Sequence, residues 1–220
     1  MSEEKPLGPP ERHRWIFRFR VDGDVRFISH HDTLRMFRRA LARTELPVRF
    51  SEGFNPAPRM SIPVPRPVGI ASDDEALVVE FEKPVDSFNA KASLSEQMPD
   101  GFSIVECRRL QAGEQVQPDL VRYRIELNGE TKPDLNDRAN EIMAAAALPV
   151  LRAETPGVNA RTLDVRPYLV ELAVDSGGVE FTLRVTGSGT AKPSEIAGLL
   201  SFDPSAINHR IRRIAVIWKT

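Results

Sequence analysis

Cysteine is almost absent from this sequence, since Cys107 is the only one in 220 residues. A disulfide framework needs pairs of cysteines, and a thiolate zinc or iron–sulfur site needs three or four cysteines, or cysteines with histidines, at close spacing. This chain alone can provide none of these. A single cysteine is the pattern expected of a protein in the reducing cytoplasm, and we expect neither a metal nor a cofactor.

Long hydrophobic runs are missing as well. No stretch approaches the roughly 18 apolar residues of a membrane-spanning helix. The opening residues, MSEEKPLGPPER, are acidic and rich in proline, whereas a signal peptide would be basic and then apolar. We therefore expect no membrane contact, and we interpret residues 1–11 as a mobile tail.

Lysine is missing from the most basic part of the chain. Between Arg12 and Arg66 there are 12 arginines, no lysine and 5 acidic residues, a net charge of +7. The whole chain carries −1, so the rest must sum to −8. A basic quarter on an acidic remainder indicates a localised anionic partner, and the guanidinium fork matches phosphate. Arginine-rich codon usage in a GC-rich genome would give the same composition without a partner.

Hydrophobic periodicity predicts one order of elements twice: strand, helix, strand, strand, helix, strand. In the first half we expect strands at 15–21, 25–28, 48–50, 75–81 and 101–110, and helices at 30–44 and 86–98. In the second half we expect strands at 119–128, 149–154, 161–174, 178–186 and 211–218, and helices at 133–147 and 193–200.

Each half is thus a split βαβ unit, in which two helices cover one face of an antiparallel sheet. The sequence predicts an α+β protein of two tandem ferredoxin-like units, residues 12–110 and 119–220. The apolar-poor segment between them is the expected join. Arginine at alternate positions in WIFRFRV and in VRYRIEL is consistent with a duplication.

The helix expected at 30–44 has two different faces. At 100° per residue, its apolar residues share one arc, and Arg35, Arg38, Arg39 and Arg43 share the opposite arc. His31 falls on the arginine side, whereas His30 falls on the apolar side, toward the sheet. We therefore expect the four arginines and His31 to bind nucleic acid.

The start of this helix carries the candidates for catalysis. Ser29 and Asp32 have the spacing of a capping box, which would account for both as helix-capping residues. His30 is either a packed histidine or a neutral imidazole beside free helix amides, where it could act as a general acid or base on RNA. With Ser29 and Asp32 beside it, His30 is the candidate catalytic residue.

A second candidate binding segment is SEGFNPAPRMSIP, residues 51–63. Its prolines stiffen the chain, Phe54 offers a ring for stacking, and Asn55 and Arg59 offer donors to RNA. A stiff loop loses less entropy on binding, which favours a recognition role. The alternative is a rigid surface loop with Phe54 turned inward.

These motifs resemble those of the bacterial radical-SAM-linked family, whose members occur as separate chains or at the end of B12-binding-type radical SAM proteins. The family's Ser-His-x-Asp motif falls on Ser29, His30 and Asp32, its Gly-Phe-Asn-Pro-x-Pro-Arg motif on residues 53–59, and its Pro-x-Gly-Ile-x-Ser segment on residues 67–72. The resemblance is closest over residues 14–82.

The resemblance implies a radical SAM enzyme as partner, and the family's occurrence near ribonuclease genes suggests RNA. Our leading hypothesis is an accessory protein of a radical SAM enzyme that binds RNA of the tRNA or rRNA type through its arginine face. One alternative is an RNA-processing or RNA-modifying enzyme that uses His30. Another is a protein–protein adaptor that binds no nucleic acid.

Overall fold

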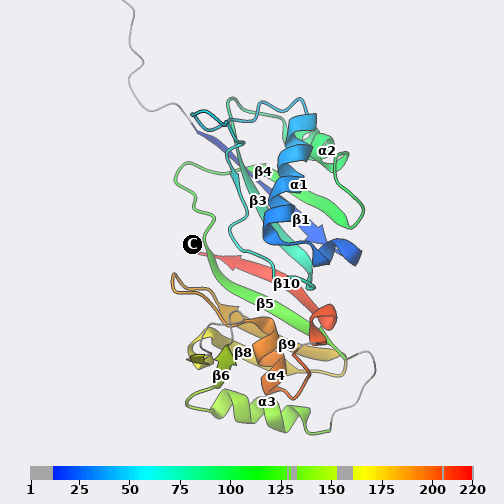
Figure 1. Cartoon of the computed structure of the whole chain (residues 1–220), viewed down its shortest axis with the longest axis vertical. Helices are drawn as coiled ribbons and strands as arrows, with labels where there is room; N and C mark the ends of the chain where they lie inside the picture. The colour runs from blue at the N-terminus through cyan, green and yellow to red at the C-terminus, as the bar shows by residue number, and fades with distance from the viewer. Residues whose placement is uncertain (1–11, 128, 130–132, 153–160, 205, 220) are drawn as a thin grey trace, which may run out of the picture.

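The computed structural model describes residues 12–127, 129, 133–152, 161–204 and 206–219 (Figure 1). The predicted mobile tail, residues 1–11, lies outside this part. None of the helices within the described residues is long and apolar enough to cross a membrane.

The centre of the molecule is one eight-stranded sheet that runs through both halves of the chain (Figure 1). Its strand order is β4-β1-β3-β10-β5-β9-β8, and β2 pairs with β3. The strands are β1 (His13–Val21), β2 (Met60–Ser61), β3 (Ala71–Phe81), β4 (Phe102–Arg109), β5 (Pro118–Glu126), β8 (Leu169–Val174), β9 (Gly178–Arg184) and β10 (Ile211–Trp218). All pairings are antiparallel except the short parallel contact between β3 and β10. A separate two-stranded sheet joins β6 (Pro149–Arg152) to β7 (Arg161–Asp164).

Within the described residues, four α-helices cover the sheet, two on each half (Figure 1). They are α1 (His30–Arg43), α2 (Ser87–Ser95), α3 (Leu135–Ala144) and α4 (Pro193–Leu199). Alternate residues of β1, Phe17 and Phe19 among them, are buried in one core cluster with Phe37 of α1. The second half has its own buried cluster, to which α3 and α4 contribute. The predicted α+β class, with a mostly antiparallel sheet, is confirmed.

The seam between the halves contains a buried ion pair. Arg213 of β10 reaches Glu75 of β3 at 2.9 Å, with side-chain exposures of only 1% and 2%. The same guanidinium donates to the Tyr123 hydroxyl at 3.2 Å. Because a charge removed from water is costly unless it is paired, the two halves depend on each other at this point.

Three predicted strands differ from the structure. Residues 23–27 form a 3₁₀ helix instead of a strand at 25–28; β1 is already paired on both edges, by β3 and β4, so it offers no edge to that segment. The strand predicted at 48–50 is reduced to isolated bridges. The strand predicted at 161–174 is divided by a 3₁₀ turn at Arg166–Tyr168, because Pro167 has no amide hydrogen for a sheet.

Candidate nucleic-acid interface

Ser29 caps α1, as its spacing predicts. The Ser29 hydroxyl oxygen accepts a hydrogen bond from the Asp32 amide at 3.1 Å and donates one to the Asp32 carboxylate at 2.7 Å. This hydroxyl bond is the largest cause of a lowered Asp32 pKa, and Arg35, at 3.2 Å, adds to it. Helix capping therefore accounts for Ser29 and Asp32 without a reaction.

His30 points to the sheet side of α1, as the helical wheel predicts. It lines a very small cavity with Phe19, Thr33, Arg66 and Glu75 among its neighbours. Burial lowers the pKa of His30, and the neighbouring charge of His31 lowers it further, so both effects favour the neutral ring.

The surroundings of His30 limit its chemistry. The cavity measures about 10 Å³, which is the space of about one water. Glu75, which provides a carboxylate in the cavity wall, is already bound to Arg213. Over the described part of the chain, no three histidine, cysteine or acidic side chains are grouped to hold a metal. On its sheet side, His30 therefore has room for packing and for a water molecule.

The predicted arginine face of α1 is present and exposed. Arg35, Arg38, Arg39 and Arg43 are all exposed, as is His31. Arg35 pairs with Asp32, but Arg38, Arg39 and Arg43 have no ion pair with any described residue. Arg35, Arg39 and Arg43 follow one another at i, i+4 spacing, at which like charges cost a few tenths of a kcal/mol per pair. The four arginines are called the α1 stripe below.

The segment around Phe54 forms a projecting loop with a closed neck. The Ser51 amide donates to the Ala57 carbonyl at 2.8 Å, and the Ala57 amide donates to the Ser51 hydroxyl at 3.1 Å. Gly53 has φ of +128°, a backbone conformation that favours glycine. Phe54 and Asn55 are exposed at the tip. The alternative that Phe54 turns inward is therefore wrong.

Arg59, the third residue predicted in this segment, lies in the neck and not at the tip. Its amide donates to the Arg49 carbonyl at 2.8 Å, and its own carbonyl accepts from the Glu80 amide at 2.9 Å. The side chain is half-buried, and its Nε has no hydrogen-bond partner in the described structure. Arg59 is thus less accessible to a ligand than Phe54 or Asn55.

The structure separates His30 from the Phe54 loop. His30 lies beside Glu75, whereas the neck of the loop is bonded to Glu80. Five residues of β3 separate these points, which is about 17 Å along an extended strand. The two motifs therefore do not form one site. The α1 stripe extends from the His30 end of α1 toward the end that carries the loop (Figure 1).

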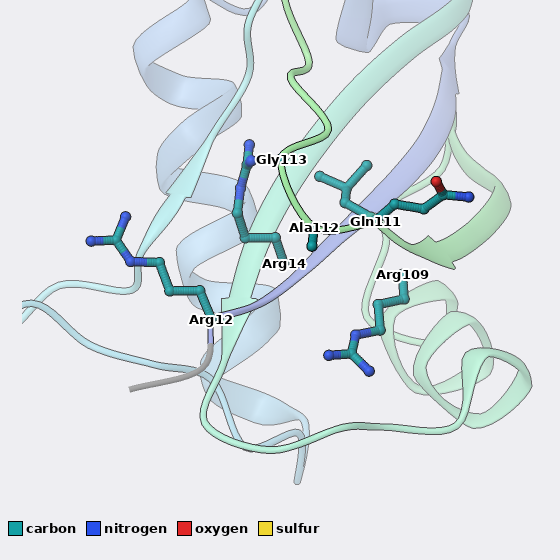
Figure 2. Close-up of a pocket in the computed structure, with 7 residues that line it drawn as sticks. Arg12, Arg14, Arg109, Gln111, Ala112 and Gly113 are labelled. Atoms are coloured by element: carbon teal, nitrogen blue, oxygen red, sulfur yellow. The ribbon is translucent and has the colours of Figure 1, made fainter. Parts of the chain in front are cut away.

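Sequence reasoning missed a third basic feature. Arg12, just before β1, and Arg14, the second residue of β1, line a cavity of about 650 Å³ with Arg109, at the end of β4 (Figure 2). Antiparallel pairing brings the two segments together, since Trp15 lies opposite Arg109. Only the register of β1 and β4 reveals this neighbourhood, because 94 residues separate Trp15 from Arg109 in the sequence.

Comparison with known proteins gives a family and a weak structural likeness. No curated protein matches the chain. A crystal structure described as an unknown protein from Galdieria sulphuraria shares 16% identity, covering 87% of this chain and 91% of that one, with a TM-score of 0.25. The profile of the family described as "Uncharacterized protein conserved in bacteria (DUF2344)" matches residues 14–193. Since this match includes most of the sequence, the chain belongs to the DUF2344 family of conserved bacterial proteins.

Proposed function

We propose that this protein binds RNA, with the α1 stripe on the phosphates and the Phe54 loop on a base. The observation that carries the proposal is that Arg38, Arg39 and Arg43 are exposed without a described carboxylate partner. Closely spaced, uncompensated guanidinium groups attract a polyanion, because each one that neutralises a phosphate also releases counterions.

In the second half of the chain, arginines such as Arg124 and Arg152 are paired with carboxylates. Arg124 is held by Asp175 and Glu180, each at 2.8 Å. Arg152 is held by Glu195 at 2.7 Å. The same chain therefore neutralises arginines elsewhere with its own carboxylates. Codon usage alone explains the number of arginines, but it does not explain why Arg38, Arg39 and Arg43 have no ion pair with a described residue.

The Phe54 loop favours RNA over an acidic protein surface as the partner. An exposed phenylalanine ring stacks on any base, which contributes about 1–3 kcal/mol per base. The closed neck holds the loop in shape before binding, so less entropy is lost in the complex. An acidic protein would be attracted by the arginines, but it would provide no flat base for Phe54.

A matched pair of phenylalanine variants tests this proposal. Phe54→Ala should weaken binding of a fluorescent single-stranded RNA by about 5- to 150-fold, since one stacked base is lost. Phe88→Ala is the control, because Phe88 is also an exposed phenylalanine but lies on α2. Fluorescence anisotropy gives both affinities. Equal affinities for the two variants would show that the loop is not part of the interface. Absence of RNA binding by the wild type would overturn the proposal.

We also infer that the fold arose from two ferredoxin-like units. The strand order is β4-β1-β3-β2 in the first half and β10-β5-β9-β8 in the second. If the main-sheet strands of each half are numbered from one to four along the chain, both halves have the order 4-1-3-2, which supports this inference. A radical SAM enzyme remains the proposed protein partner, on the strength of the motifs at Ser29–Asp32 and at residues 53–59. Co-purification from cells with and without nuclease tests this partner. Loss of the enzyme on nuclease treatment would show that RNA connects the two proteins.

A further inference from the structure

An exposed phenylalanine lies just before α1, at the other end of this helix from the Phe54 loop. Phe27 is the last residue of a short 3₁₀ helix, Gly23–Phe27, which connects β1 to α1 (Figure 1). Its exposed fraction is 54%. The Arg26 guanidinium lies over the ring, 5.0 Å from the ring centroid. An exposed ring with an arginine beside it is typical of a site on which a base of single-stranded nucleic acid stacks.

A buried arginine holds this 3₁₀ helix in place. Arg66, which is only 9% exposed, donates to the Arg26 carbonyl at 2.7 Å and to the Ile70 carbonyl at 2.6 Å. The Gly69 amide donates to the same Arg26 carbonyl at 2.8 Å. Gly69 has φ of +87°, which favours glycine, and a Cβ at this position would lie 3.6 Å from the Phe27 ring. Phe27 is therefore held in position before a ligand binds, which lowers the entropy lost on binding.

A carboxylate without a described partner lies on the same side of the 3₁₀ helix. Asp24 precedes Phe27 by three residues, and side chains at this spacing in a 3₁₀ helix are eclipsed, about 6 Å apart along the axis. Asp24 is exposed and has no hydrogen bond or ion pair with a described residue. By contrast, Asp22 and Asp73 both bind Arg212, at 2.7 and 2.8 Å. The Asp24 oxygens are therefore available to accept hydrogen bonds from a ligand.

A ring and a carboxylate together discriminate between bases. The ring stacks on any base. An ionised carboxylate only accepts hydrogen bonds, so it favours the N4 amino group of cytosine over the O4 carbonyl that uracil carries at the same position. The same carboxylate repels phosphate. The group that fits beside Phe27 and Asp24 is therefore a base and not the RNA backbone.

This site lies in line with the proposed RNA interface. Phe27 precedes His31, the first residue on the arginine side of α1, by four residues. The helix has 14 residues, which is a length of about 21 Å. Since even a stacked strand advances about 3.4 Å per nucleotide, an RNA of ten nucleotides is long enough to contact both the Phe54 loop and Phe27.

We propose that Phe27 and Asp24 bind one base of the RNA and select a base with an exocyclic amino group, cytosine in preference to uracil. This inference rests on the proposed function and adds the substrate class, a single-stranded RNA with an amino-bearing base at this position. Phe27 provides the stacking surface, and Asp24 accepts the hydrogen bond that distinguishes the bases.

The test compares ten-nucleotide oligo(C) and oligo(U) by fluorescence anisotropy. The wild type should bind oligo(C) about 10-fold more tightly, a typical gain for one hydrogen bond to a charged group. Asp24→Asn should reduce this ratio toward one, because an amide can donate to uracil as well as accept from cytosine. Asp137→Asn is the matched control, since it removes an exposed carboxylate on α3, and it should keep the ratio. Phe27→Ala should weaken binding of both RNAs by about 5- to 150-fold.

Failure of this inference is distinguishable from failure of the proposed function. Equal affinities of the wild type for oligo(C) and oligo(U), or an unchanged ratio in Asp24→Asn, would overturn the base preference and leave RNA binding in place. Unchanged affinities in Phe27→Ala would overturn the stacking role of Phe27. Binding of neither RNA by the wild type would overturn both proposals. Thermal unfolding checks that the variants are folded; if Phe27→Ala is not, Phe27→Leu, which keeps an apolar contact with Gly69 but has no flat ring, replaces it and should show a similar loss.

Discussion

The α1 stripe gives the sharpest quantitative prediction. If Arg35, Arg38, Arg39 and Arg43 each neutralise one phosphate, they contribute about −2.8 to the slope of log K against log salt concentration for single-stranded RNA. Between 50 and 200 mM salt, this contribution alone weakens binding by about 50-fold. The quadruple change to alanine should remove that part of the salt dependence, and the slope should become less negative by nearly three.

Stability and binding should change independently in this variant. Alanine has the highest helix propensity, and the change removes like charges at i, i+4 spacing, so α1 should be no less stable. The assay is fluorescence anisotropy with a labelled RNA at 50, 100 and 200 mM salt, together with thermal unfolding. Arg122→Ala is the control for a general loss of positive charge. An unchanged slope in a folded quadruple variant would refute the assignment of the stripe to phosphates, and an equal loss of affinity in the control would refute its specificity.

Three further predictions concern the buried groups. Glu75→Gln should lower the free energy of unfolding by about 3–5 kcal/mol in urea titrations, because the Arg213 charge stays buried without its partner. The double change Glu75→Leu with Arg213→Met should restore most of the lost stability. A loss below 1 kcal/mol in Glu75→Gln would contradict the importance of this ion pair. Since the pKa of His30 is lowered on folding, the unfolded state binds the proton more readily, so stability should fall as pH drops below about 6.5. His30→Gln should flatten that dependence, and identical pH profiles for the two proteins would contradict it. Burial raises the pKa of Cys107 to about 12, so iodoacetamide at pH 8 should alkylate the folded protein about a thousand-fold more slowly than the unfolded one; similar rates would contradict it.

The sequence predicted the elements whose signals are local. The period of 3.6 residues and the Ser29 cap located α1 at His30–Arg43, within one residue of the expected helix. Apolar residues bounded by turns located β10 at Ile211–Trp218. The same periodicity separated His30 from the arginine face, because the angle of a side chain around a helix depends only on its position in the helix.

Local signals failed where a segment depended on a distant partner. The segment at 25–28 has the composition of a strand, but β1 had no free edge for it. Similarly, the sequence contains 12 arginines between residues 12 and 66, but it does not show which of them are neutralised by other groups of the protein. Arg18 is bound by Asp74 and Arg66 by main-chain carbonyls, whereas Arg38 and Arg39 remain exposed.

The sequence by itself thus determined the helices, most of the strands and the two faces of α1, since these follow from the pattern of consecutive residues. The tertiary structure alone decided that His30 and the Phe54 loop lie apart, that Arg109 joins Arg14 at one cavity, and that Arg213 reaches Glu75 across the seam. The physical reason is that such neighbourhoods follow from strand order and register. Both are set by the joint burial of residues far apart in the chain, which no short stretch of sequence encodes.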